Sequence, residues 1–252
     1  LVSANDTGAR RLVEMMREFK LKSLDKLGNH ILTQSKKGAL EAIRKLPDGE
    51  WSYALPLDGY EKPITIKAKL KIKDGRVKVD YRGTSEVSIF GINSPRTYTE
   101  AYTVFALKAI IAPHVPNNIG SLSCFEIETD PHTIVDPIRP SPVTSRHVTG
   151  QMLADAVFGC LCQVLPGQVQ AESAGSIWML MFNSAHGRVS KEQLVNAQQY
   201  SVLAIGLGGI GGRPGKDGLA CMAFPSGIGG IPIEIIEGQC PLWFKEKQFL
   251  AN

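Results

Sequence analysis

Apolar residues in the first 48 positions are spaced as in two amphipathic helices. In residues 8–20 they recur every three or four positions, which places them on one side of a helix. A second helix is expected over residues 23–45, with Ser23 as its cap and the Pro-Asp-Gly turn at 47–49 after its end. Residues 1–48 are therefore predicted to form a helical segment of their own.

The pattern changes to a period of two after residue 50. Residues 64–73 alternate between apolar side chains and mostly lysines, Asp74-Gly75 is typical of a hairpin turn, and residues 77–81 suit the return strand. The lysines suggest either the solvated face of this hairpin or a phosphate-binding patch, and the solvated face is favoured. A lone hairpin is marginally stable, so its apolar face must pack against other elements.

The remaining pattern mixes helices with short strands. Helices are expected over residues 95–112 and 148–164, the second with Thr149 as a cap, and the four prolines of residues 130–145 indicate an extended connector. Strands are expected over residues 125–129, 177–182, 202–205, 219–224, 231–237 and 242–249. The predicted fold class is α/β (α+β): an N-terminal helical pair, then a mixed-sheet body with packed helices over residues 49–252.

Composition narrows the range of partners. A net charge of +4 over 252 residues is too small to indicate nucleic-acid binding, and no apolar run is long enough to suggest a membrane span. The five cysteines contain no C-x-x-C pair, so we expect buried thiols in a reducing, cytoplasmic location. Because the chain begins with Leu1 and not with Met, we also expect a part upstream of it.

A glycine-rich stretch covers residues 206–218. Gly206, Gly208 and Gly211 match the G-x-G-x-x-G spacing of dinucleotide-binding loops, which would suggest a stand-alone oxidoreductase. That fingerprint must lie at the start of a helix, however, and Pro214 would break a helix that begins in this stretch. A tight loop that lines an active site or an interface is therefore favoured over a cofactor cradle.

Two other segments carry candidate chemistry. At a predicted helix start, Arg146 and His147 could hold an anion, or Arg146 could simply pair with a carboxylate. Residues 173–176 (Ser-Ala-Gly-Ser) lack the G-x-S-x-G pattern, so a turn of small residues is favoured over a nucleophile loop. The five histidines show no metal-ligand spacing, so no metal site is predicted in this chain.

Short motifs occur in order along nearly the whole chain. They are GARRL at 8–12, LPDG at 46–49, DYRGTS at 80–85, GINSP at 91–95, PNNIGS at 116–121, AESAGS at 171–176, GGIGGRP at 208–214 and PIE at 232–234. Together they resemble the hydantoinase B family, which includes subunits of ATP-dependent N-methylhydantoinases, the C-terminal half of 5-oxoprolinases, and subunits of acetone and acetophenone carboxylases. Where many members have HxTN, residues 223–227 read AFPSG, which looks more like the carboxylase branch.

The resemblance implies a subunit or fragment of an ATP-dependent carboxylase or amidohydrolase complex. It implies a hydantoinase A-type partner that binds ATP and Mg²⁺ and phosphorylates an amide or enolate oxygen of a small-molecule substrate. Further small subunits are possible, and a divalent metal is expected on an upstream part that this chain lacks. The alternative is a non-catalytic structural subunit of such a complex.

Candidate site residues follow from the resemblance and from the two polar segments. Arg213, Asn93 and Arg146 are expected to act in catalysis. The residues expected to contact substrate are Gly208, Gly209, Gly211, Asp217 and His147. Arg213, which lies in the glycine-rich stretch, is expected near the reacting site, because phosphoryl chemistry needs positioned cations.

Overall fold

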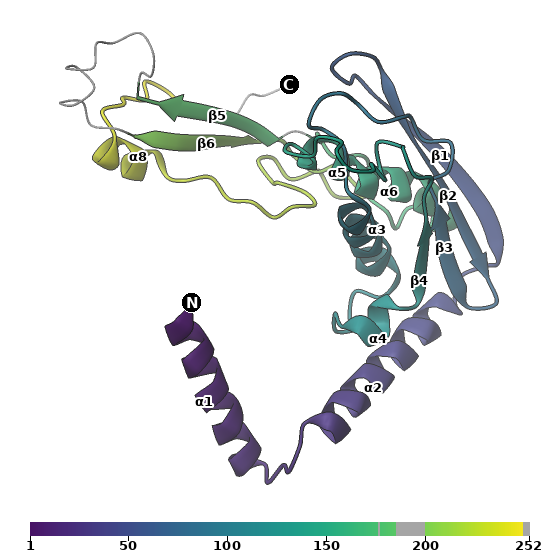
Figure 1. Ribbon diagram of the computed structural model, residues 1–252. Coiled ribbons are helices and arrows are strands. Elements are labelled where there is room, and N and C mark those ends of the chain that lie inside the picture. Colours follow the sequence, from purple (N-terminus) through teal and green to yellow (C-terminus); the bar gives the residue numbers. More distant parts are fainter. Residues whose placement is uncertain (176, 185–199, 249–252) are drawn as a thin grey trace.

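A four-stranded mixed sheet forms the centre of the fold in the computed structural model, which describes residues 1–175, 177–184 and 200–248 (Figure 1). The strands are β1 (Gly49–Leu57), β2 (Ile64–Lys73), β3 (Arg76–Asp80) and β4 (Phe125–Glu128), in that spatial order. The first three pair antiparallel, and β4 lies parallel to β3. Asp74 and Gly75 both adopt positive φ, at 51° and 71°, which is the backbone that a two-residue hairpin turn requires. The predicted hairpin is therefore confirmed.

One face of the sheet is covered by helices. The alternation along β2 buries Ile66, Leu70 and Ile72, which are at most 1% exposed. Helices α3 (Arg96–Ile111) and α6 (Met152–Val164) lie on this side of the sheet, and the four-residue helix α5 (His147–Gly150) directly precedes α6 (Figure 1). Packing against these helices gives the hairpin the apolar cover that it needs to be stable.

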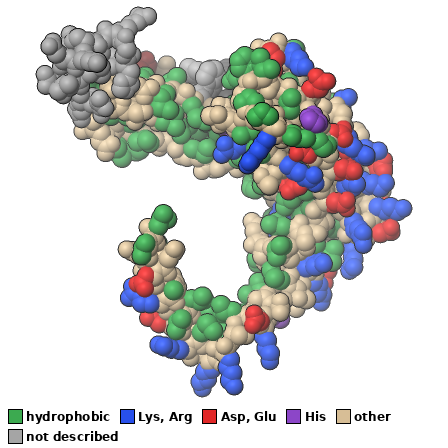
Figure 2. Space-filling model, in the orientation of Figure 1, with side chains coloured by type: hydrophobic (Ala, Val, Ile, Leu, Met, Phe, Trp, Pro, Cys, Tyr) green, Lys and Arg blue, Asp and Glu red, His purple; other side chains and the backbone are tan. Residues whose placement is uncertain are grey.

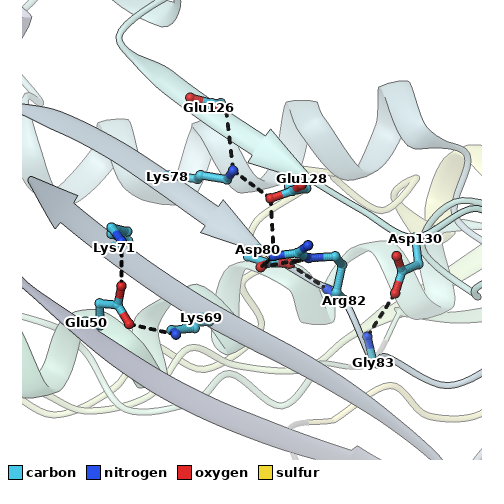
Figure 3. A network of polar contacts seen from close by, with 10 residues as sticks. All are labelled: Glu50, Lys69, Lys71, Lys78, Asp80, Arg82, Gly83, Glu126, Glu128 and Asp130. Atoms are coloured by element: carbon cyan, nitrogen blue, oxygen red, sulfur yellow. Dashed lines mark hydrogen bonds and ion pairs between the residues drawn. The ribbon is translucent and has the colours of Figure 1, made fainter.

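The opposite face of the sheet is charged and solvated. The carboxylate of Glu50 lies 2.7 Å from the ammonium groups of both Lys69 and Lys71, and Lys78 lies 2.6 Å from Glu128 (Figure 3). The hydrogen bonds from Lys69 and Lys71, and then their charges, lower the pKa of Glu50 to about 2. Because the lysines pair with acids of the same face, this face fits the predicted solvated surface better than a phosphate-binding patch.

Two helices precede the sheet, as predicted. Helix α2 (Asp25–Ile43) buries Ser35, Ala39 and Ile43, and the Asn118 amide that caps the short helix α4 (Ile119–Leu122) donates to the Ser35 hydroxyl at 2.7 Å. The predicted Ser23 cap is wrong, because α2 begins beyond Leu24 and has no side-chain cap.

Helix α1 is less embedded. It spans Val2–Glu18, so it begins earlier than the predicted 8–20 helix, and it buries no residue. It stands apart from the sheet across an open space, so that α1, α2 and the body together form an arc (Figure 1). Apolar side chains gather along the inner side of this arc (Figure 2). The division into residues 1–48 and 49–252 stays a prediction.

The C-terminal third departs most from the predicted elements. Strands β5 (Ile177–Asn183) and β6 (Ser201–Leu207) form the expected antiparallel pair. The strands predicted at 219–224 and 231–237 are wrong, because the first segment is turns and coil and the second enters helix α8 (Ile233–Gln239). Pro232 has the φ of −56° that starts a helix, and no neighbouring strand in the described sheets offers hydrogen bonds to this segment.

The last predicted strand, 242–249, is also wrong as far as residue 248, where the chain is irregular, and residue 249 lies outside the described residues. The remaining expectations for fold class are confirmed: a helical pair is followed by a mixed-sheet body with packed helices.

The cysteines are only partly buried. Cys160 and Cys240 are buried, but Cys162 and Cys221 are exposed, so the prediction of buried thiols is wrong for two of the five. Cys160 faces the sheet and contacts the carbonyl of Ala68, whereas two residues along the helix rotate Cys162 to the far side. Within the part of the chain that the structure describes, no helix is both long and apolar enough to span a bilayer.

Candidate functional site

The glycine-rich stretch forms a tight loop that leaves β6 and opens no helix. Backbone bonds in both directions join Arg213 and Lys216, at 3.0 and 2.9 Å, and Gly215 between them has φ of 72°. This turn leaves the side chains of Arg213, Lys216 and Asp217 exposed. A dinucleotide fingerprint needs a helix at this point, so the oxidoreductase interpretation loses its basis. The stretch is a tight loop, as predicted, and its role in lining an active site or an interface stays a prediction.

The loop rests on residues 171–175. The amide of Ala171 donates to the Gly212 carbonyl at 2.8 Å, and the amide of Ala174 donates to the Gly209 carbonyl at 2.9 Å. A Cβ atom at Gly211 would overlap the carbonyl group of Ala171 and would lie 2.6 Å from the carbonyl oxygen of Glu172. Glycine at 211 therefore allows two backbones to approach as closely as these bonds require.

Residues 171–175 are in turn tied to helix α6 by a buried carboxylate. Asp155 is fully buried and accepts two hydrogen bonds from Ser173, from its amide at 3.2 Å and from its hydroxyl at 2.7 Å. The Ser173 hydroxyl also accepts from the amide of Gly175 at 3.2 Å. Burial raises the pKa of Asp155, and the two bonds from Ser173 oppose that shift.

A second tie comes from strand β1. The Tyr53 hydroxyl donates to the Glu172 carboxylate, and this bond, with burial, raises the pKa of Tyr53 to about 12. The Tyr53 ring passes over Gly159 of α6, where a Cβ atom would lie 2.6 Å from a ring carbon. Glycine at 159 thus lets the tyrosine cross the helix and reach Glu172.

A shallow depression of about 580 Å³ lies between the loop and the end of α6. Its lining residues are Cys162, Gly167, Val169, Ala171, Gly212, Arg213, Pro214, Lys216, Asp217 and Gly218. The candidates Arg213 and Asp217 therefore face one cavity, while Gly209 and Gly211 contact the 171–175 and 219–220 segments behind it. Two cations beside one carboxylate suit an anionic or partly charged small molecule.

Arg146 and His147 belong to a different group of contacts. The Arg146 guanidinium lies 5.7 Å from the centre of the Tyr98 ring, and no carboxylate pairs with it among the described residues. Burial, then the charge of Arg146, lowers the pKa of His147, which favours a neutral imidazole. The predicted Thr149 cap is wrong, because α5 starts at His147 and the Thr149 hydroxyl has no partner in the described structure.

Tyr98 carries this group toward the C-terminal segment. It stacks on Tyr102 with 4.4 Å between ring centres, and its hydroxyl donates to the Tyr102 hydroxyl at 2.9 Å. The Tyr102 hydroxyl lies 2.8 Å from that of Ser226. Ser226 falls in the AFPSG segment, so Arg146 is linked through two tyrosines to the segment that stands where many family members have HxTN.

Asn93 is fully buried and bonded within a loop. Its side-chain oxygen accepts from the Ser88 amide at 2.8 Å, and its side-chain nitrogen donates to the carbonyls of Ser88, Phe90 and Pro142 at 2.8–3.0 Å. These bonds hold the connector that leads to Arg146. In this conformation Asn93 can position neighbours but presents no surface to a substrate.

The sequence analysis missed Asp155 and Tyr53. Asp155 had a visible signal, because it is the only charged residue within the apolar run 152–164. A carboxylate there must either face solvent or be buried with hydrogen-bond partners. Tyr53 carried no such signal in the sequence, because tyrosine is common in strands.

Comparisons with known proteins agree on one family. The whole chain, residues 1–252, matches the family model described as Hydantoinase B/oxoprolinase. A protein described as the B-type component of a D-/L-hydantoinase, from Pseudomonas sp. (strain NS671), is 29% identical over 96% of this chain and 42% of its own length.

Two solved structures share the fold. An ATP-dependent caprolactamase from Pseudomonas jessenii has a TM-score of 0.81 and 20% identity, over 95% of this chain and 42% of that one. A nucleotide-free acetone carboxylase has a TM-score of 0.67 and 16% identity, over 82% of this chain and 30% of that one. The chain thus spans less than half the length of each of these relatives.

Proposed function

Because the chain belongs to the Hydantoinase B/oxoprolinase family, we propose that it forms one wall of the active site in an ATP-dependent cyclic-amide hydrolase or carboxylase complex. This wall is the surface that lines the depression between the glycine loop and the end of α6. The proposal is supported by one observation above all: a loop without a helix, tied to the core at several points, holds Arg213 and Lys216 exposed beside a cavity.

The role of these cations follows from the expected chemistry. Phosphorylation of an amide or enolate oxygen places negative charge on the substrate, and attack by water or the approach of a carboxyl donor redistributes that charge. A guanidinium held in place before the reaction stabilises this charge without the cost of reorganising solvent. Arg213 would provide the bidentate contact and Lys216 a second positive charge.

We assign the nucleotide to a hydantoinase A-type partner and not to this chain. The glycine loop leads into a turn and not a helix, so it lacks the aligned N-terminal amides that bind phosphates in nucleotide loops. Among the described residues no group of three or more His, Cys, Asp and Glu could hold a metal, so no step is assigned to a metal held here. Mg²⁺ would accompany the ATP of the partner.

The test uses the full complex of this chain with its ATP-binding partner. Phosphate release and product formation are measured with hydantoin, caprolactam, and acetone plus bicarbonate, to find a substrate that is turned over with ATP. With that substrate, Arg213→Ala is expected to lower kcat about 100-fold, the loss typical of one charge-stabilising donor. The control is Arg76→Ala, an exposed arginine of the β2–β3 hairpin that does not line the depression.

The same experiment distinguishes a catalytic subunit from the alternative, a non-catalytic structural subunit. If Arg213→Ala keeps full activity while omission of this chain abolishes it, the chain is a structural subunit. The exposed Leu12 and Val13 of α1, with Phe19 just after its end, would suit such a scaffold role. Turnover by the chain without its partner would refute the assignment of ATP to that partner.

A further inference from the structure

A buried carboxylate lies behind the glycine loop, away from the depression. Asp155 is 0% exposed and is the one charged residue of helix α6, and both of its oxygens are occupied by one residue, Ser173. Burying a carboxylate is costly unless hydrogen bonds or an opposite charge offset the loss of its hydration. Here it binds a segment that has no regular secondary structure of its own.

The segment bound by Asp155 is the one that carries the glycine loop. Ser173 lies between Ala171 and Ala174, whose amides bond the carbonyls of Gly212 and Gly209. Hydrogen bonds at Ser173 and at its neighbours, joined by the backbone of residues 171–174, therefore link α6 to the loop, and the link ends one residue before Arg213.

We propose that Asp155 is a positioning residue, which through Ser173 fixes residues 171–175 under the glycine loop and so sets the place of the Arg213 guanidinium. This inference rests on the proposed function only for the consequence in catalysis. The mechanical part, that Asp155 fixes the loop, holds or fails independently of any activity.

Cys162 offers a direct report on that mechanical part. The residue as a whole is exposed and lines the depression together with Gly212 and Arg213, but its thiol is partly shielded from water. Burial raises its pKa, so displacement of the loop should both uncover the thiol and bring that pKa down. Cys124, which lies between α4 and β4, serves as an internal reference in the same sample.

The experiment compares Asp155→Ala, Asp155→Asn and Ser173→Ala. Alkylation by N-ethylmaleimide is followed at Cys162 and Cys124 by peptide mass spectrometry, and kcat and KM are measured in the full complex. Asp155→Ala leaves the Ser173 amide and hydroxyl without their acceptor, so Cys162 should be alkylated about tenfold faster, with the Cys124 rate unchanged. The value of kcat should fall about tenfold or more with little change in KM, because Arg213 acts on developing charge.

Asp155→Asn is the conservative control. An amide can accept from the Ser173 amide and donate to its hydroxyl, so this variant should recover most of the slow alkylation and most of kcat. If Asp155→Asn instead loses all activity while alkylation stays slow, the carboxylate has a chemical role, and positioning of Arg213 is refuted as the reason for its effect on kcat. Should Asp155→Ala fail to fold, Ser173→Ala decides the matter, because it removes the hydroxyl bond of the same link from outside the helix and leaves only the amide bond to Asp155.

The two proposals can fail separately. Unchanged Cys162 alkylation in both Asp155→Ala and Ser173→Ala would overturn the positioning role. Fast alkylation in Asp155→Ala together with full activity of Arg213→Ala would keep the positioning role and refute the proposed function of the loop.

Discussion

The contact between the glycine loop and residues 171–175 predicts a large difference between two adjacent glycines. In Gly211→Ala the new methyl group would lie 2.6 Å from the Glu172 carbonyl oxygen and overlap the carbonyl of Ala171. In Gly212→Ala the nearest atom, the Lys216 carbonyl oxygen, would be 3.5 Å away, which is ordinary contact. Neither glycine adopts a positive φ, so only space separates the two substitutions.

The size of the effect follows from the geometry. Restoring normal contact at residue 211 requires the loop to move by about 1 Å. Such a shift takes the bonds from the amides of Ala171 and Ala174, now 2.8 and 2.9 Å, beyond hydrogen-bonding distance. Two net hydrogen bonds contribute about 1–3 kcal/mol, which corresponds to about 5- to 150-fold faster opening of the segment.

Hydrogen–deuterium exchange of peptides that contain residues 171–175 measures this opening. We expect Gly211→Ala to accelerate exchange there by that factor, with the sheet strands unchanged, and Gly212→Ala to match the wild type. Equal exchange in the two variants would refute the reasoning, since it would mean that the loop does not rest closely on this segment.

Two further predictions concern the body. Leu161→Ala, which truncates a fully buried side chain of α6, should lower the free energy of unfolding by about 2–5 kcal/mol in urea titrations. Leu27→Ala, on the exposed side of α2, should lower it far less. Similar losses in the two variants would contradict the assigned core. Glu50→Gln should lower the urea midpoint at pH 6. The folded pKa of about 2 lies below the ordinary 4.5, so the stability from Glu50 is present above 4.5 and is lost as the pH falls through 2. The difference between variant and wild type should therefore shrink on acidification, and a constant difference from pH 6 to pH 2 would rule out this linkage.

Local pattern was sufficient for elements whose period extends over many residues. The alternation of residues 64–73 and the Asp74-Gly75 turn predicted β2, its turn and its partner strand. The run at 231–237 has no such period, and a short apolar run suits a strand or a buried helix equally well. The deciding features were Pro232 and the absence of a partner strand for this run in the described sheets, and only the second depends on tertiary structure.

The candidate site divides in the same way. The glycine loop and Arg213 could be picked out because glycine spacing and proline placement are local properties. The bond between Asp155 and Ser173 joins residues 18 positions apart, and the bond between Tyr53 and Glu172 joins residues 119 apart. No periodicity encodes which acid meets which hydroxyl, so these ties appear only once the sheet and α6 are packed.

The same ties explain how a loop with few side chains can hold a cation in one place. A stretch of glycines has high conformational entropy and cannot fix Arg213 by itself. Its order must come from partners that are already rigid, and here these are β1 through Tyr53 and α6 through Asp155, both acting on residues 171–175. A site built in this way is sensitive to changes in the core that never touch substrate. Residues 49–57 and 152–164 therefore belong to the functional unit as much as the loop does.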